Sequence, residues 1–416
     1  MAYAKCDNAT HGNLAKVNNV PKANIASINS VGVPAAAGAT MWAISSRDMW
    51  ISWAATANIA DVLEWEGNAY QLENNSSDTN DIAYGLDGNG GAKWMTVNNT
   101  NGDEIKFDGN NDITDESTWS THNVSTDYGN NRLETIQYTG GDGSADSSSG
   151  NSVTRVGCWI ACGRTSTNAA WIHRSVDGGA NWTHLNLFGL TNIAGNASDA
   201  DYHIRALAGD GTGNWMLAQR GNLYFSSDSG VSFSYLIQPT GAGTNVIRDI
   251  VYTNGTWCVL VNVGGVTYLY VCAGSTAANM DAAGDWGNTK MQDDPSDSNP
   301  AAAAKLTGTA LRRMAGAGGR VVAVDAARSL AATVNGKATP VIEGTTQTLP
   351  DAGSLNTIAT DGTIWLAGSD GDNVGADGGD ICRSLDGGES WSLIVTGIVS
   401  QQRTVEGIAA DVLLPL

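Results

Sequence analysis

Charged side chains recur at one position of a segment that this chain repeats. The clearest copies, Ile204–Ala208, Ile247–Val251 and Leu355–Ala359, read apolar-x-x-apolar followed by a small or apolar residue. The second position of successive copies is Asn80, Glu134, Arg205, Arg248, Arg312, Asn356 and Glu406. An arginine guanidinium can hold a carboxylate through two parallel hydrogen bonds. We take the charged members of this set, Arg205, Arg248, Arg312, Glu134 and Glu406, as candidate binding residues; alternatively, the arginines bond carbonyls of neighbouring repeats as structural spacers.

No catalytic or metal-binding pattern accompanies these residues. The chain has no Ser-His-Asp order, no Gly-rich phosphate loop and no His-Glu-x-x-His, and its five histidines lack metal-ligand spacing. With 42 acidic residues, no pair of carboxylates can be chosen as a glycosidase acid and base. The run from Asp108 to Glu116 alternates oxygen ligands as calcium prefers, but it lacks the glycine and terminal glutamate of an EF-hand. We predict solvated turns there, no catalytic residue, no metal and no cofactor.

The composition predicts an all-β protein. Of 416 residues 51 are glycine and only 15% are charged, and runs of Thr, Val, Trp and Tyr alternate with Gly/Asn/Asp turns. The net charge of −20 argues against nucleic acid and anionic membrane as partners. No stretch reaches the ~20 apolar residues that span a bilayer. The first residues lack the apolar core of a secretory signal, so export by that route is not expected.

Most of the six cysteines fall inside apolar runs, where a buried thiol is the expected state. Cys158 and Cys162 have no second pair at zinc-ligand spacing. Cys258 and Cys272 could face each other across one hairpin, which makes them the only disulfide candidate.

The repeated segment sets the architecture. Each copy precedes an Asp/Asn-Gly turn and an apolar strand that often carries Trp, and four-stranded repeats of roughly 40–50 residues are typical of propeller blades. A last copy, Val405–Asp411, has no strands after it. The first strands, at Thr40–Ile44, Met49–Trp53 and Val62–Trp65, have no copy before them. We predict a seven-bladed β-propeller whose C-terminal strand completes the first blade; six or eight blades remain alternatives.

A second pattern, Ser-x-Asp-x-Gly-x-x-aromatic, occurs at residues 175–182, 226–233 and 384–391. The Asp can accept hydrogen bonds from turn amides, the Gly permits positive φ, and the aromatic residue re-enters the sheet. The pattern resembles the Asp-box, or BNR, repeat of sialidase-like β-propellers. The residues that carry the resemblance are Asp177, Asp228, Asp386, Trp182 and Trp391.

This resemblance implies a location for the charged positions. In the family, each box joins the two outer strands of a blade on the side away from the ligand, and each innermost strand starts at the binding face. The second position of the repeated segment would then lie near the channel mouth, where sialidases hold a substrate carboxylate with arginines. The family's Arg-Ile-Pro motif is missing, and the proximity of Tyr138 to Glu134 does not establish a nucleophile pair.

The first 38 residues form a separate segment. Leu14–Val20 and Ile25–Val31 echo one another at an offset of eleven residues, and Val33–Gly38 reads as a linker. The echo resembles units at the ends of some tailed-bacteriophage virion proteins, where such segments attach to the particle. The alternative is an extended arm packed on the sheet. We predict an N-terminal arm, 1–38, and a propeller, 39–416.

The first functional hypothesis is a non-enzymatic binding or structural module of a phage virion (tail, fibre or capsid decoration), acting as adhesin or scaffold. It would contact other virion proteins through the arm, and possible ligands include a cell-surface glycan; an oligomeric assembly is expected. The second hypothesis is an extracellular glycoside hydrolase of the sialidase or Asp-box class. A third is an assembly factor resembling the Asp-box propellers that help build photosystem II, which also carry arginines but are normally exported.

Overall fold

The computed structural model describes residues 16–17, 20–21, 39–46, 49–72, 78–87, 91–98, 104–109, 112–123, 132–141, 143, 145–146, 153–164, 170–185, 204–239, 246–263, 266–274, 276–290, 311–325, 329–334, 341–342, 347–348, 354–369, 379–398 and 404–412. The chain divides into two compact units, Met1–Ala37 and Gly38–Leu416, so the observed boundary falls one residue before the predicted one. In the first unit, β1 (Lys16–Val17) and β2 (Val20–Pro21) form a hairpin. The second copy of the echo and the linker lie outside the described residues.

The second unit is built from antiparallel sheets whose strands follow one another in chain order. Within the described ranges, six of these sheets have four strands. They are β6 (Thr79–Leu86), β7 (Ala92–Asn98), β8 (Glu104–Asp108) and β9 (Trp119–Asn123); β10 (Arg132–Thr139), β13 (Cys158–Arg164), β14 (Ala170–Ser175) and β15 (Thr183–Leu185); β16 (Ile204–Gly209), β17 (Trp215–Gln219), β18 (Asn222–Ser226) and β19 (Ser234–Ile237); β20 (Val246–Thr253), β21 (Thr256–Val263), β22 (Val266–Cys272) and β23 (Gly287–Lys290); β29 (Leu355–Thr360), β30 (Trp365–Ser369), β31 (Gly379–Ser384) and β32 (Ser392–Ile398); and β33 (Val405–Ala410), β3 (Met41–Ser46), β4 (Trp50–Ala55) and β5 (Ala69–Gln71).

A further sheet departs from this form. It comprises β24 (Leu311–Ala317), β25 (Arg320–Asp325), β26 (Ser329–Val334), β27 (Val341–Ile342) and β28 (Gln347–Thr348). Both β27 and β28 pair with β26, at different positions along it. Six sheets therefore have the four strands predicted for each repeat, and this five-stranded sheet differs from them at its outer edge. A small separate hairpin joins β11 (Ala145–Asp146) to β12 (Val153–Thr154).

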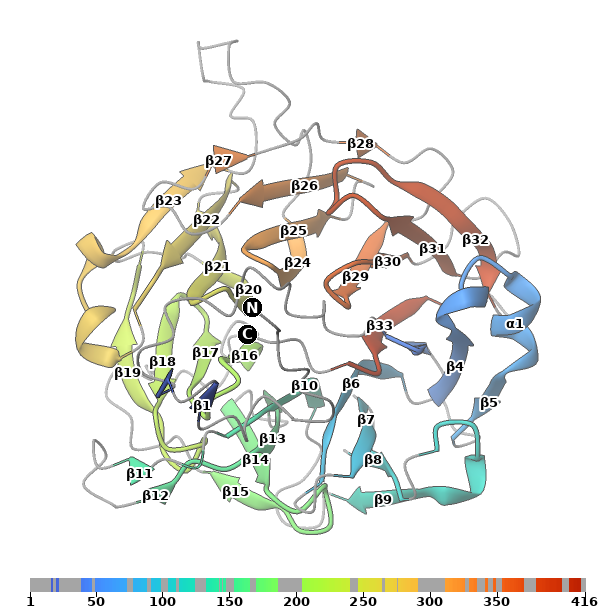
Figure 1. Cartoon of the computed structure of the whole chain (residues 1–416), viewed down its shortest axis with the longest axis horizontal. Helices are drawn as coiled ribbons and strands as arrows, with labels where there is room; N and C mark the ends of the chain where they lie inside the picture. The colour runs from blue at the N-terminus through green and yellow to red at the C-terminus, as the bar shows by residue number, and fades with distance from the viewer. Residues whose placement is uncertain are drawn as a thin grey trace. The chain divides into compact units, whose positions relative to one another are not determined.

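The sheets of the second unit follow one another around a central axis, which makes this unit a β-propeller (Figure 1). The first strand of each sheet contacts the first strand of the next, in the order β6, β10, β16, β20, β24, β29, β33 and back to β6. The predicted closure is confirmed, because β33 pairs with β3 and places Ala410 opposite Trp42. The Asp411 carboxylate adds to this closure by accepting hydrogen bonds from the backbone N–H groups of Thr40 at 2.7 Å and Met41 at 3.0 Å.

One predicted strand is wrong. Residues Val62–Gly67 form the helix α1, and the outer strand of this sheet is β5, after the helix. The Asp61 side chain caps the helix by accepting a hydrogen bond from the Leu63 N–H at 3.0 Å. Trp65 is buried and its Nε1 donates to the Ile59 carbonyl at 3.0 Å. The N-cap and the buried indole favour a helical turn at a site whose apolar residues also suited a strand.

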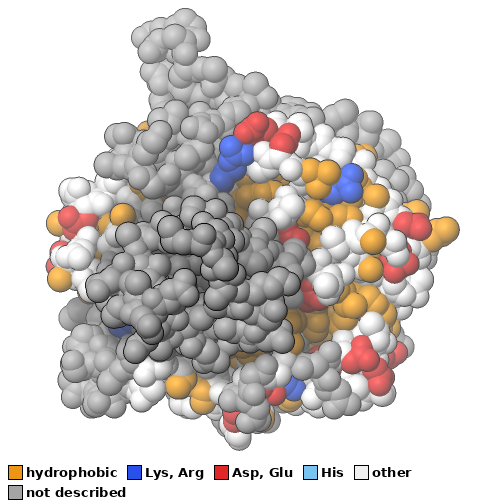
Figure 2. Space-filling model, in the orientation of Figure 1, with side chains coloured by type: hydrophobic (Ala, Val, Ile, Leu, Met, Phe, Trp, Pro, Cys, Tyr) orange, Lys and Arg blue, Asp and Glu red, His pale blue; other side chains and the backbone are white. Residues whose placement is uncertain are grey.

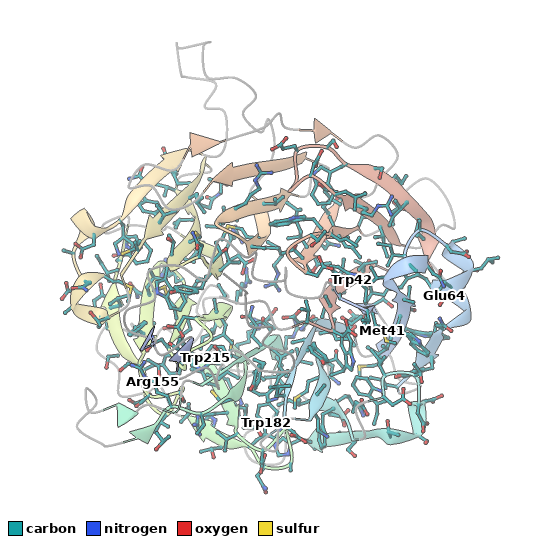
Figure 3. All side chains as sticks on the ribbon, in the orientation of Figure 1. Met41, Trp42, Glu64, Arg155, Trp182 and Trp215 are labelled. Carbon is teal, nitrogen blue, oxygen red and sulfur yellow. The ribbon has the colours of Figure 1, made fainter. Side chains whose placement is uncertain are left out.

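Short 3-10 helices occur at Thr56–Asn58, Glu116–Thr118, Ala277–Asn279 and Ala283–Asp285. The core lies between neighbouring sheets. Its largest fully buried side chains include Trp42, Trp65, Trp159, Trp215 and Trp257. Trp42 lies within its sheet, whereas Glu64 lies on α1 at the outer edge (Figure 3). On the visible face, Asp and Glu side chains are spread over the described residues, with Lys and Arg side chains among them (Figure 2). No helix within the described ranges is long and apolar enough to cross a bilayer.

The five described cysteines are free and buried, as expected for structural thiols. Cys258 and Cys272, the disulfide candidate, do not face each other. Cys258 pairs with Val271 and Cys272 pairs with Trp257, so the register is offset by one residue. Because successive side chains of a strand point to opposite faces, the two thiols lie on opposite faces of the sheet.

Candidate functional site

The seven positions singled out in the repeated segment share one backbone feature. In each inner strand the pairing with the second strand skips one residue near the start. The skipped residues are Asn80, Glu134, Arg205, Arg248, Arg312, Asn356 and Glu406. An extra residue opposite a regular partner is a β-bulge, which bends the strand and redirects its side chain. The sequence repeat thus marks a repeated bulge.

The bulge residues make contacts of different kinds. The Asn80 amide donates to the Leu133 carbonyl of the next sheet, a contact of the kind expected of the arginines as spacers. The Glu134 carboxylate lies 4.0 Å from the Arg164 Nε. The Arg205 carbonyl accepts from the Arg313 Nη1 at 3.3 Å. Arg248 lies on β20 and Glu406 on β33, and Arg312 lies on β24.

The charged groups that line the central channel lie one residue beyond the bulges. A cavity of about 470 Å³ runs along the axis and is lined by residues from all the inner strands, including Asp81, Asp249 and Arg313. The Asp81 Oδ2 accepts from the Thr135 hydroxyl at 2.7 Å and from the Ile136 N–H at 3.2 Å, both on the next inner strand. The Asp249 Oδ2 accepts from the Met314 N–H at 2.6 Å in the same manner. Each carboxylate therefore ties its sheet to the following one.

Burial dominates the electrostatics of this cluster. Burial raises the pKa of Asp249 to about 6, although Arg313 and the backbone amides of Met314 and Ile250 oppose the shift. Burial also raises the pKa of Asp81. For Arg313, burial lowers the pKa, but the carboxylates of Asp249, Asp81, Glu134 and Glu406 outweigh it and the net shift is upward. The predicted mouth residues Glu134 and Glu406 therefore act on Arg313 at long range.

Tyrosines from three sheets line the cavity toward the opposite ends of the inner strands. They are Tyr84, Tyr138 and Tyr252, each packed against the tryptophan directly across the hairpin: Trp94, Trp159 and Trp257, with ring centroids 4.7–5.3 Å apart. The cross-strand pairing fixes each ring. The hydroxyl groups of these tyrosines make no hydrogen bond to any part of the chain that the structure describes. The cavity therefore has charged groups near one end and hydroxyl groups toward the other.

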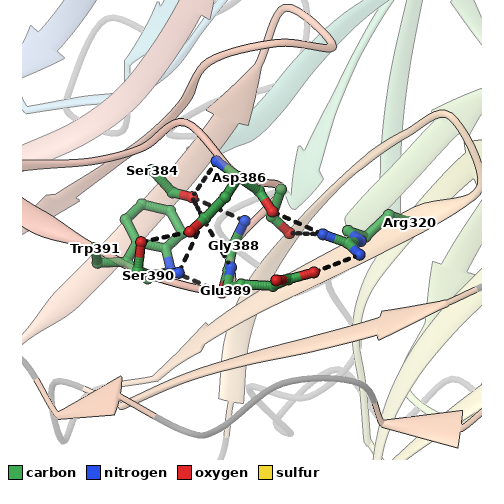
Figure 4. A network of polar contacts seen from close by, with 8 residues as sticks. Arg320, Ser384, Asp386, Gly388, Glu389, Ser390 and Trp391 are labelled. Atoms are coloured by element: carbon green, nitrogen blue, oxygen red, sulfur yellow. Dashed lines mark hydrogen bonds and ion pairs between the residues drawn. The ribbon is translucent and has the colours of Figure 1, made fainter.

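The three Ser-x-Asp turns have the predicted geometry and join the two outer strands of their sheets. In the copy at 384–391, the Asp386 Oδ1 accepts from the Ser384 hydroxyl and the Ser390 N–H, both at 2.8 Å (Figure 4). The Trp391 Nε1 donates to the Gly388 carbonyl at 3.1 Å, and Gly388 has φ of +88°. Hydrogen bonds to the carboxylate outweigh its partial burial and lower the pKa of Asp386 to about 2.

The other two turns repeat these bonds. In the copy at 175–182, Asp177 accepts from the Asn181 N–H at 2.9 Å, and the Trp182 Nε1 donates to the Gly179 carbonyl at 3.0 Å. In the copy at 226–233, Asp228 accepts from the Ser232 N–H at 3.0 Å. This looser copy has Ser229 where the others have glycine, and Ser229 adopts a φ of +56°.

In two of these turns, an arginine of the preceding sheet donates hydrogen bonds to the turn. The Arg174 Nε donates to the Ser229 carbonyl at 2.6 Å. Arg320 donates through Nη1 to the Asp386 carbonyl at 2.8 Å, and its Nη2 lies 2.8 Å from the Glu389 carboxylate (Figure 4). The turns therefore also serve as contacts between sheets.

The other residues considered as metal ligands make local contacts. In the acidic run at 108–116, Asp112 caps the Thr114 N–H and Asp115 caps the Ser117 N–H, each at 3.0 Å. Among the described residues, no three His, Cys, Asp or Glu side chains are grouped to hold a metal. His173 packs against Trp171 and His184, and burial lowers its pKa to about 3.

The three channel residues Asp81, Asp249 and Arg313 were not singled out from the sequence. The sequence shows a charged residue directly after the second position in each of these three segments, but the pattern alone does not tell which of the two positions faces the channel. The structure brings these three together around one cavity. It places the turn residues Asp177, Asp228 and Asp386 in separate sheets.

Comparisons with known proteins find neighbours among solved structures. No family model matches the chain, and no curated protein matches it. Solved structures that it resembles include YCF48 bound to a D1 peptide, at 14% identity over 76% of this chain and 81% of that one, with a TM-score of 0.43. YCF48 from Cyanidioschyzon merolae matches at 13% identity over 76% of this chain and 84% of that one, with a TM-score of 0.45.

Proposed function

We propose that this protein is a non-enzymatic binding or structural module, acting as an adhesin or scaffold in a phage virion. The observation that carries the non-enzymatic part is the state of the channel carboxylates. Asp81 and Asp249 accept backbone and hydroxyl hydrogen bonds from the next inner strand. A glycosidase needs two carboxyl groups that face the substrate. Carboxylates that hold adjacent sheets together suit a rigid scaffold better than acid–base catalysis.

The scaffold proposal includes two finer assignments. We take the five-stranded sheet as a seventh blade whose outer strand is split into β27 and β28, since its inner strand β24 contacts β20 and β29 on either side. We also take the Ser-x-Asp turns as Asp-boxes, on the basis of their hydrogen bonds and their place between outer strands.

Placement in a virion rests on the sequence of residues 1–38 and on the acidic surface. The arm would attach the propeller to other virion proteins, and a cell-surface glycan is the candidate external ligand. Mass spectrometry of purified phage particles tests this placement. We expect to find the full chain in particles, and we expect the chain to be missing from particles when residues 1–38 are deleted. The deleted protein must still contain a folded propeller, so that misfolding does not explain the loss. Absence of the full chain from particles would overturn the proposal.

Glycoside hydrolysis is the alternative. It is supported by the positions of Arg205 and Arg248, which occupy equivalent bulges on successive inner strands. Hydrolysis of a fluorogenic sialoside or of a β-glucan panel tests it. Activity that disappears in Arg205→Ala or Arg248→Ala, and persists in the peripheral variant Arg320→Ala, would replace the non-enzymatic proposal.

A further inference from the structure

The hydrogen-bonding groups of the channel are only partly used within the protein. Arg313 has five N–H donors, and within the described residues its only hydrogen bond is to the Arg205 carbonyl. No ion pair within 4.0 Å joins Arg313 to Asp81 or Asp249 among those residues, although both carboxylates act on its pKa. The guanidinium therefore presents spare donors to the cavity.

The carboxylates have spare acceptor positions. A carboxylate offers about four lone-pair positions. Asp249 accepts two hydrogen bonds, from Ile250 at 2.9 Å and Met314 at 2.6 Å. Asp81 accepts three, from Ile82, Thr135 and Ile136. Donors and acceptors thus stand together around one cavity, and hydroxyl groups, which both donate and accept, match such a set.

The charge of the cluster disfavours an ionic ligand. The cluster places charges of both signs, two carboxylates and one guanidinium, around the same cavity. An added anion would meet Asp81 and Asp249, and an added cation would meet Arg313. Burying an uncompensated charge costs several kcal/mol in proteins. A neutral ligand avoids this cost.

We propose that the channel binds a neutral ligand rich in hydroxyl groups, of the size of one or two sugar rings, with Arg313 donating to it and Asp81 and Asp249 accepting from it. The cavity of about 470 Å³ lies in the usual range of small-molecule sites. Tyr84, Tyr138 and Tyr252 also line the cavity, and their hydroxyls would supply further contacts. This proposal rests on the non-enzymatic binding role above and names a ligand class for it.

Ligand-observed NMR and calorimetry on the full chain test the ligand class. The matched probes are glucose, glucosamine and glucuronate, which share one ring and differ in charge, with inositol as a neutral polyol that is not a sugar. We expect a neutral probe to bind at least tenfold more tightly than glucosamine or glucuronate. Preference for a charged probe, or no binding by any of them, would overturn the proposal.

Variants locate the site. Tyr252→Phe removes one channel hydroxyl and should weaken binding about three- to tenfold. Tyr235→Phe, on the outer strand β19, is the matched control and should leave affinity unchanged. Arg313→Met should weaken binding more than tenfold. If this variant does not fold, the comparison of Tyr252→Phe with Tyr235→Phe still tests whether the ligand binds in the channel. Equal affinity in both tyrosine variants would overturn the channel location. Particle incorporation is measured separately, so failure to bind sugar leaves the virion proposal standing, and the reverse also holds.

Discussion

Two carboxylates of this propeller, Asp249 in the channel and Asp386 in an outer turn, accept similar hydrogen bonds under opposite conditions of burial. Asp249 in the channel is buried, and its pKa is raised to about 6. Asp386 in an outer turn is exposed, and its pKa is lowered to about 2. Both accept backbone N–H groups. Burial therefore decides the sign of the shift, because desolvation disfavours the ionised form.

Carboxylates of the channel and of the outer turns also differ in how far along the chain their partners lie. Asp386 bonds residues within four positions of itself. Asp249 bonds Met314, 65 residues away, and Asp81 bonds Ile136, 55 residues away. The turn carboxylates thus stabilise one hairpin, whereas the channel carboxylates hold adjacent sheets in register.

Removal of the channel guanidinium should give the largest effect. Arg313→Met leaves Asp81 and Asp249 without their compensating charge, and we expect the free energy of unfolding to fall by about 3 kcal/mol at pH 7. The matched control is Arg320→Met, which removes a partly exposed arginine from a turn contact and should cost about 1 kcal/mol or less. Urea unfolding of both variants measures the difference. Equal losses would show that the channel charges are not coupled.

The opposite pKa shifts of Asp249 and Asp386 predict that their contributions to the free energy of unfolding depend on pH in opposite directions. Because the pKa of Asp249 is raised from 3.8 to about 6, its contribution to the free energy of unfolding is fully present below pH 3.8 and is lost as pH rises through 6. This loss is on the order of 3 kcal/mol. Because the pKa of Asp386 is lowered from 3.8 to about 2, its contribution is present above pH 3.8 and is lost as pH falls through 2.

Thermal unfolding from pH 2 to 7 separates the two carboxylates. Asp249→Asn should reduce the loss of stability between pH 4 and 6. Asp386→Asn should change the stability only below pH 4. An unchanged slope between pH 4 and 6 in Asp249→Asn would contradict the assignment to the channel.

The range of the contacts explains what the sequence could predict. The Ser-x-Asp turns are local, so their positions and bonds were predictable from residues such as Ser384 and Asp386. The closure was predictable because Val405–Asp411 repeats the inner-strand pattern without a blade to follow it. The helix at Val62–Gly67 is not predicted because a run as short as Val62–Trp65 fits the periodicity of a strand as well as that of a helix. The Asp61 side chain, which caps the helix, favours the helix.

The channel cluster was not predictable for a different reason. The second position of the repeat is the bulge residue. The bulge shifts by one residue the alternation of side chains between the two faces of the strand. Asp81, Asp249 and Arg313 therefore line the cavity instead of their neighbours. Only the pairing register, which depends on tertiary contacts, could reveal that shift.

Packing between inner strands gives a third test, with a smaller effect. A Cβ atom on Gly85 of β6 would lie 2.4 Å from the Tyr138 Cγ and 2.6 Å from the Trp159 Cζ2 of the next sheet. We expect Gly85→Ala to cost about 2 kcal/mol by overpacking. Gly67→Ala, at the end of α1 with no atom within 4 Å, is the control and should be close to neutral. Comparable stability of the two variants would mean that the sheets can separate here.

The smallest expected effect compares two turns with the same hydrogen bonds. Asp228 is 2% exposed and Asp386 is exposed, yet each accepts the N–H of the residue four positions later. Replacement by alanine removes similar bonds in both, and loss of such a cap costs about 1 kcal/mol. Asp228→Ala should cost about 1 kcal/mol more than Asp386→Ala, because its partners stay buried without an acceptor. Urea unfolding measures both, and an equal cost would mean that burial, which governs the channel, has no influence on the turns.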